Sequence, residues 1–126
     1  MVKIDHLMIA VSDWKRSRDW YVRHLGFGVE FEIPDGGHAG LGVAALQDDA
    51  GLTLFLEETR EPIQSGQASY TLQVDDVDAS YDRLSAAGVV FIEPPSKLFW
   101  GYGAELADPD GHRLGLYDEA SMAAKG

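Results

Sequence analysis

Two side chains in the first half of the sequence, His6 and Glu57, are of the types that general acid–base chemistry uses. Each lies in an apolar stretch whose alternation predicts a β-strand, residues 3–11 for the histidine and residues 52–57 for the carboxylate. A carboxylate beside an imidazole orients the ring for proton transfer. A core histidine held by one hydrogen bond explains His6 equally well. We therefore treat His6 and Glu57 as candidate catalytic residues and leave both interpretations open.

A second candidate feature is the segment Phe99-Trp100-Gly101-Tyr102, which places three aromatic rings within four residues. Such rings can simply belong to the core. Glycine at positions 101 and 103 leaves backbone uncovered beside them, as expected where a flat ligand stacks. We therefore expect Trp100 and Tyr102 to wall the opening of a ligand site.

The elements that must position these residues occur twice along the chain. Val11 corresponds to Val74, and Gly51 in the turn after Asp48 corresponds to Gly111 after Asp108. Such a duplication predicts two similar modules that pack about a pseudo-two-fold axis, with the functional site where they face each other. We expect one domain, residues 1–126, with modules at about 1–58 and about 68–118.

Hydrophobic periodicity predicts the order βαβββ in each half, so the fold class is α+β. The first half has a helix at about 14–25, capped by Asp13 and Gly26, and later strands at 29–33, 41–46 and 52–57. The second half has strands at 69–74, 89–92, 101–106 and 112–117, and a helix at about 77–87. We expect a linker at 59–67, a loop at 93–96 and a frayed tail at 120–126.

Alternation along the strands predicts that aliphatic residues such as Leu54 and Leu114 face the helices. The other faces carry a mixture of polar, charged and aromatic residues. This mixture indicates a solvent-accessible cavity rather than two sheet faces that are simply exposed to solvent. We expect the ligand-binding residues to be His6, Phe55, Glu57, Ser69, Thr71, Trp100, Tyr102, Arg113 and Tyr117. The remaining histidines are expected on a helix surface (His24), in a loop (His38) and in a turn without a partner (His112).

The amino-acid composition limits the classes of partner and chemistry that fit this protein. A net charge of −11 argues against nucleic-acid and anionic-membrane partners and weakly favours a cationic or neutral one. The sequence has no cysteine, which excludes disulfides and thiolate chemistry. It shows no membrane span and no signal-peptide pattern, so we expect a cytoplasmic protein.

The segments Ile4 to Asp13, Trp20-Tyr21 and Leu25-Gly26-Phe27 resemble the N-terminal signature of the vicinal oxygen chelate superfamily. Trp100 to Gly103 followed by Asp108 to His112 resembles its C-terminal part. This group includes glyoxalase I, extradiol dioxygenases and bleomycin-resistance proteins. The resemblance covers almost the whole chain and implies two paired βαβββ modules that form a curved sheet cup, usually completed in a homodimer.

Enzymes of this group bind a divalent metal with His and Glu from four strand positions. The resemblance puts these positions at His6, Phe55, Ser69 and Gly115, of which only His6 is a good ligand. A frame shift could bring Glu57 inward, and Tyr117 is the nearest further candidate. We therefore expect no tightly held metal and no other cofactor.

The Trp100-Gly101 and Thr53-Leu54-Phe55 segments also resemble the bleomycin-resistance branch, in which aromatic residues and an acidic surface hold a bulky cationic drug. We therefore expect a homodimer that binds a small organic molecule, aromatic or cationic, in a cup without a complete metal site. The alternative is a metal-dependent lyase, isomerase or dioxygenase of the glyoxalase I type that uses His6 and Glu57. A third reading is a vestigial member that acts only as a protein-interaction domain.

Overall fold

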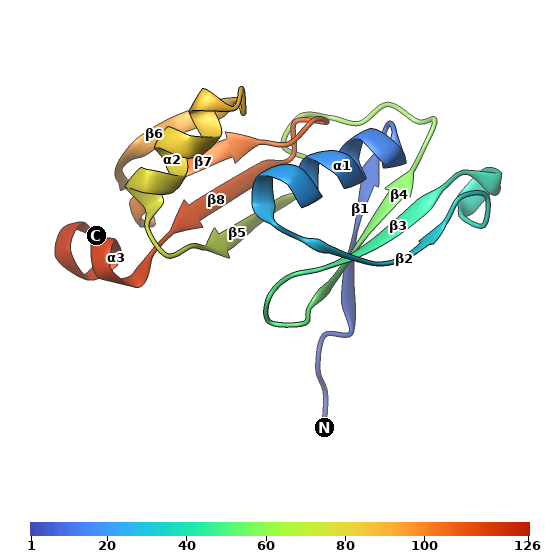
Figure 1. Ribbon diagram of the computed structural model, residues 1–126, viewed down its shortest axis with the longest axis horizontal. Coiled ribbons are helices and arrows are strands. Elements are labelled where there is room, and N and C mark those ends of the chain that lie inside the picture. The colour runs from blue at the N-terminus through green and yellow to red at the C-terminus, as the bar shows by residue number, and fades with distance from the viewer. The chain divides into compact units, whose positions relative to one another are not determined.

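Each half of the chain folds as a strand, a helix and three further strands. The computed structural model describes residues 1–126, which divide into two compact units, Met1–Ile63 and Gln64–Gly126. Each unit holds one four-stranded mixed sheet with a helix on one side of it (Figure 1). The predicted α+β fold of two βαβββ modules is confirmed. No helix is long and apolar enough to cross a membrane.

The first unit has its sheet in the order β1-β4-β3-β2, with β1 parallel to β4 and the other neighbours antiparallel. Its elements are β1 His6–Val11, α1 Trp14–Leu25, β2 Gly28–Ile33, a 3-10 helix His38–Gly40, β3 Val43–Gln47 and β4 Thr53–Glu58.

The second unit repeats this order as β5-β8-β7-β6, with β5 parallel to β8. Its elements are β5 Ser69–Gln73, α2 Val77–Ala86, β6 Phe91–Leu98, β7 Gly101–Ala107, β8 Arg113–Tyr117 and α3 Glu119–Lys125.

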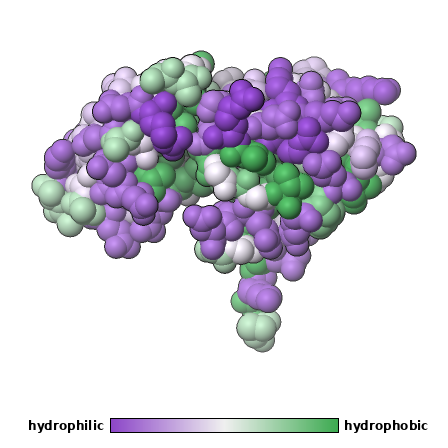
Figure 2. Space-filling model, viewed as in Figure 1, coloured by the Kyte–Doolittle hydropathy of each residue, from purple (hydrophilic) through white to green (hydrophobic).

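The core of each unit lies between its sheet and its helix. In the first unit, Leu54 and Leu56 of β4 are buried together with Trp14 and Tyr21 of α1. In the second unit, the buried leucines of β8 and the buried residues of α2 occupy the same places: Leu114, Leu116, Val77 and Leu84. The outward sides of the helices are polar, and the face shown in Figure 2 is mostly hydrophilic.

In both units, an aspartate carboxylate accepts hydrogen bonds from backbone N–H groups of the turn before the last strand. Asp48 accepts hydrogen bonds from the N–H groups of Ala50 and Leu52, at 3.0 and 2.8 Å. Asp108 does the same for Asp110 and His112, at 2.9 Å each. Side-chain acceptors of this kind hold a tight turn.

The first N–H of each major helix donates to a carboxylate at the end of the unit's last strand. Trp14 N–H donates to Glu58 at 3.1 Å, and Val77 N–H donates to Asp118 at 2.7 Å. Helix N-termini leave backbone donors without a helical partner, so these carboxylates tie each helix to its sheet.

Two predictions of local structure are wrong. The predicted loop at 93–96 is part of β6, because β6 is an edge strand and tolerates Pro94 and Pro95, whose missing N–H groups would break a central strand. The predicted frayed tail at 120–126 is α3, whose start Asp118 caps by accepting from the Ser121 N–H at 2.6 Å.

We expect Leu54→Ala to lower the free energy of unfolding by about 2–5 kcal/mol, because it leaves a cavity in the buried layer beneath α1. Met8→Ala, on the opposite face of the neighbouring strand and 51% exposed, should change it by less than about 1 kcal/mol. Urea denaturation of both variants measures the difference. A larger loss for Met8→Ala would mean that the two faces are exchanged.

Asp118 generates a second prediction, because backbone hydrogen bonds from Ser121 and Val77 hold the pKa of its carboxyl below the usual value. Its stabilising effect is complete above the pKa of an unfolded aspartate and is lost as the pH falls through the lowered value. Asp118→Asn should therefore lower the melting temperature at neutral pH and weaken its dependence on acid. Thermal melts of both proteins between about pH 2 and pH 7 would show this. Parallel curves would contradict it.

Candidate functional site

The side of the first sheet that faces away from α1 carries a group of apolar and aromatic side chains. We call it the first open face, and it is formed by His6, Met8, Phe31, Ile33, Phe55 and Glu57. Met8, Phe31 and Ile33 are exposed on it, and Phe55 is half-buried. Aromatic rings from different strands contact each other, with 5.7 Å between the ring centroids of Phe31 and Phe55. This face suits the flat surface of an aromatic molecule.

His6 lies at one end of the first open face. Its ring centroid is 4.4 Å from that of Phe55, and its Nδ1 lies 2.9 Å from an Asp5 carboxylate oxygen. The imidazole is thus packed against an aromatic ring and oriented by its sequence neighbour. It is still partly accessible, so a ligand on this face can reach it.

Of the two interpretations of His6, the one that pairs it with Glu57 is wrong. In the parallel pair of β1 and β4, His6 lies opposite Thr53, whereas Glu57 lies opposite Ala10. Four residues of strand separate the two positions, which is about 13 Å. Alternation along the strands predicted the correct face for both residues, but only the register shows that they lie at opposite ends of it.

The second sheet has a corresponding surface on the side away from α2, which we call the second open face. It is formed by Ser69, Thr71, Gln73, Gly103, Glu105, Arg113, Gly115 and Tyr117. Strands β5 and β8 pair so that Ser69 lies opposite Arg113, Thr71 opposite Gly115 and Gln73 opposite Tyr117. The Tyr117 hydroxyl donates to the Gln73 side chain at 3.3 Å. This face is polar where the first is apolar.

Trp100 and Tyr102 lie on opposite sides of the second sheet. A Cβ atom built on Gly103 would stand 2.3 Å from a ring carbon of Trp100, so the indole covers this glycine on the second open face. Tyr102 instead donates its hydroxyl to Asp78 of α2 at 2.9 Å, and this bond raises the pKa of the tyrosine. The prediction that both rings wall one opening is therefore corrected: Tyr102 faces the helix because side chains alternate along β7.

Sequence reasoning missed Glu105. This half-buried residue of β7 lies opposite Gly115 of β8 and follows Gly103 on the same face. Period-two alternation from Gly103 was the signal that could have found it.

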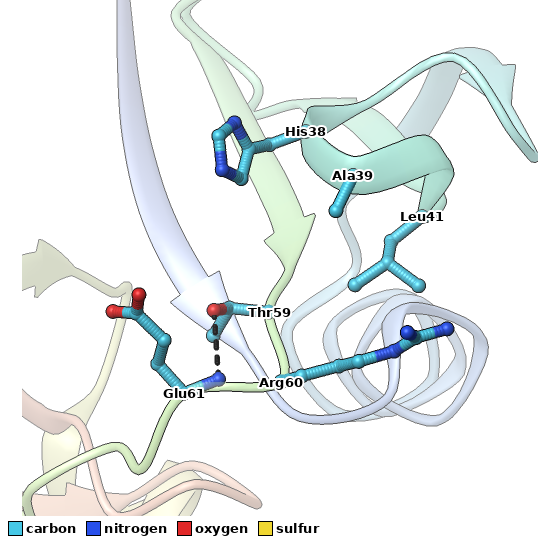
Figure 3. A pocket seen from close by; sticks show the side chains of 6 residues that line it. All are labelled: His38, Ala39, Leu41, Thr59, Arg60 and Glu61. Atoms are coloured by element: carbon cyan, nitrogen blue, oxygen red, sulfur yellow. Dashed lines mark hydrogen bonds between the residues drawn. The ribbon is translucent and has the colours of Figure 1, made fainter.

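His112 and His38 also differ from expectation. His112 is not a turn residue without a partner: it is buried, and its Nδ1 accepts from the Ala68 N–H at 3.3 Å. His38 lines a pocket of about 290 Å³ with Thr59, Leu41 and three neighbours (Figure 3). The side chains of Arg60 and Glu61 point away from each other there, so no charge converges on this pocket.

The residues at the positions that the resemblance assigns to a metal do not fit a metal here. Phe55 offers no donor atom and packs on His6, Gly115 has no side chain, and Ser69 is a neutral hydroxyl. No group of three or more His, Cys, Asp or Glu side chains could hold a metal ion.

Comparison with known proteins identifies the family. The model of the Glyoxalase/Bleomycin resistance protein/Dioxygenase superfamily matches residues 3–116. The chain belongs to this superfamily. The suspected vicinal oxygen chelate membership is thereby confirmed, since the same superfamily also supplies solved structures with this fold.

Individual proteins are similar to this chain over nearly its whole length. TnmS3, an antibiotic binding protein from Streptomyces sp. CB03234, is 29% identical with a TM-score of 0.77, covering 94% of this chain and 96% of its own. A member from Sphaerobacter thermophilus DSM 20745 is 26% identical with a TM-score of 0.76, covering 94% and 98%. The uncharacterized protein YetH of Bacillus subtilis (strain 168) is 24% identical, covering 89% and 95%.

The residues at the superfamily's metal positions generate a prediction about metal content. We expect the purified protein to carry well under one divalent ion per chain, because Phe55, Ser69 and Gly115 provide too few donors. Added Ni²⁺ or Zn²⁺ should barely shift its melting temperature, since only a ligand that binds the folded state stabilises it. Elemental analysis after dialysis and thermal melts test this. A stoichiometric metal that survives dialysis would contradict it and favour the glyoxalase I-type alternative.

Proposed function

We propose that this protein binds a small organic molecule with an aromatic part on an open face of its sheets and holds it without a metal centre. The observation that carries the proposal is Phe55 at a metal position of the superfamily, packed against His6 and Phe31. A face built from aromatic rings in contact binds the apolar surface of a ligand rather than a metal ion.

The similarity to TnmS3 supports this choice. TnmS3, which shares 29% of its residues with this chain, is an antibiotic-binding protein. Trp100 gives the second open face an indole, a group that stacks on flat ligands. Thr71, Arg113 and Tyr117 on the same face provide polar groups that orient such a ligand.

The proposal includes assembly into a homodimer. Exposed Met8, Phe31 and Ile33 form a contiguous apolar surface that favours burial against a ligand or another chain. The resemblance to the vicinal oxygen chelate superfamily also implies a cup that is completed in a homodimer.

Isothermal titration with a panel of flat aromatic antibiotics, bleomycin included, tests the proposed function. We expect at least one of them to bind with a dissociation constant in the micromolar range or below. A panel without binding, together with turnover of a small substrate in the presence of metal, would favour the enzyme instead.

The face assignment predicts different effects for two aromatic residues of the same hairpin. Trp100→Ala should weaken a ligand found in that titration by about 1–3 kcal/mol, because the stacking surface is lost while the layer beneath α2 is untouched. Tyr102→Phe should leave binding unchanged and lower the melting temperature, since it removes the hydrogen bond to Asp78. If Tyr102→Phe alone impairs binding, the ligand does not occupy the second open face.

The proposed homodimer has a test of its own, which does not depend on the ligand. Sedimentation velocity at tens of micromolar should give the mass of a dimer, because a stable association needs an apolar interface of the kind that the first open face offers. Phe31→Glu, which places a charge on that face, should shift the protein toward the monomer if the face is buried in the dimer. A monomeric wild-type protein under these conditions would refute the homodimer.

A further inference from the structure

Two polar side chains at the His6 end of the first open face each have their hydrogen-bonding direction set by a carboxylate. His6 of β1 lies directly opposite Thr53 of β4, and alternation places both side chains on the side away from α1. The His6 Nδ1 lies 2.9 Å from a carboxylate oxygen of Asp5. The Thr53 hydroxyl donates to the Glu30 carboxylate at 2.7 Å. Each carboxylate therefore determines which atoms remain for a ligand.

The Asp5 carboxylate determines the tautomer of the His6 ring. An ionised carboxylate only accepts hydrogen bonds, so Nδ1 carries the proton that lies between the two groups. In a neutral imidazole the other nitrogen, Nε2, then has no proton and presents a lone pair. The ring forms no other hydrogen bond within the protein, and the side chain is 37% exposed. The imidazole thus offers a hydrogen-bond acceptor to a ligand.

The Glu30 carboxylate acts in the same way on the Thr53 hydroxyl. A hydroxyl has one proton and two lone pairs, so an oxygen that donates to Glu30 can only accept from any further group. A β-bulge makes this contact possible. The pairing of β2 with β3 shifts between Val29 and Phe31, so Glu30 is the extra residue, and a bulge of this kind redirects side chains. Thr53 therefore provides a second acceptor.

The two acceptors lie beside an aromatic ring and a hollow in the surface. Phe55 is the next residue after Thr53 on the same face of β4, and its ring centroid is 4.4 Å from that of His6. A hollow of about 360 Å³ adjoins Thr53 on the other side. It is lined by Lys3, Ile4, Asp5, Ala50, Gly51, Leu52 and Thr53. A flat ligand can thus cover Phe55 while its edge reaches the acceptors.

The other polar groups at this end are two possible donors and the two carboxylates. Gln47 of β3 lies opposite Thr53, and Lys3 lines the hollow. Asp5 and Glu30 are negatively charged, so they repel a ligand that carries a carboxylate. A neutral ligand avoids this repulsion and can still donate to both acceptors. The direction of its hydrogen bonds, rather than its charge, is therefore the property that this end of the face can recognise.

We propose that His6 Nε2 and the Thr53 hydroxyl oxygen form a subsite for a neutral aromatic ligand that carries hydroxyl or amino groups as hydrogen-bond donors. The apolar part of the ligand packs on Phe55, and its donors meet two acceptors on strands that lie about 4.8 Å apart. This inference rests on the proposed function, because it names the hydrogen-bonding character of the ligand that the first open face accepts.

The tautomer of His6 can be tested without any ligand. Long-range ¹H–¹⁵N spectra of the imidazole at about pH 8 show which nitrogen carries the proton, and we expect Nδ1. Asp5→Asn should increase the share of the form protonated at Nε2, because an amide can donate to Nδ1 as well as accept from it. Asp35→Asn is the control, since it removes the same charge from an exposed loop residue and should leave the tautomer unchanged.

Two probes of similar shape then test the acceptors themselves. At about pH 7.5 both 2-naphthol and 2-methoxynaphthalene are neutral, but only 2-naphthol has a donor. We expect 2-naphthol to bind about two- to tenfold more tightly, as one further hydrogen bond allows. Titrations of ¹⁵N-labelled protein, followed at the amides of His6 and Thr53, give both affinities and locate the probes.

Removing the acceptors should abolish this preference. The double variant His6→Phe, Thr53→Val keeps a ring against Phe55 and a side chain of similar shape on β4, so both probes should bind it with equal affinity. Asp5→Asn should reduce the preference while both acceptor residues are still present, whereas Asp35→Asn should keep it. The Asp5 variant thus separates the direction of the hydrogen bond from the shape of the site.

The possible results differ in what they overturn. A His6 ring protonated at Nε2 in the wild-type protein, equal binding of both probes, or a preference that survives the double variant would overturn the subsite. Each of these results leaves the proposed binding of aromatic molecules intact. Binding of neither probe at this face would also overturn the subsite, and the antibiotic titration would then decide the proposed function by itself.

Discussion

The structure depends on burying one face of each four-stranded sheet under one helix. Leucines at every second position of β4 and β8 form this layer, and α1 and α2 cover it with Tyr21 and Leu84. Removing this apolar surface from water is the main favourable contribution to folding. Since side chains alternate along a strand, assigning one face to the core leaves the other face free of that requirement.

The different requirements on the two faces of each sheet explain how the two units resemble each other and where they differ. The helix-facing layer and the capping carboxylates Glu58 and Asp118 recur in both units. The open faces vary instead, with Phe55 in one unit and Gly115 at the corresponding place in the other. Side chains on an open face can change without creating a cavity in the core, so this is where ligand recognition can diverge at little cost in stability.

The sequence predicted most of the fold because its signals are local. Alternation identified the strands, and Asp13 and Gly26 marked the ends of α1 as they do in the structure. The failures have local reasons as well. Pro94 and Pro95 suggested a loop, but an edge strand has room for residues without an N–H, and α3 depends on a cap at Asp118 that also bonds to α2.

For the candidate site, the sequence by itself determined which face most residues occupy, because that depends only on the period of the strand. The resemblance to the vicinal oxygen chelate superfamily put Phe55, Ser69 and Gly115 at the positions where its enzymes need metal ligands. Only the tertiary structure decided which residues are neighbours, because strand register and hairpin geometry join segments far apart in the chain. It separated His6 from Glu57, turned Tyr102 toward Asp78, and set Glu105 beside Gly115 on the next strand.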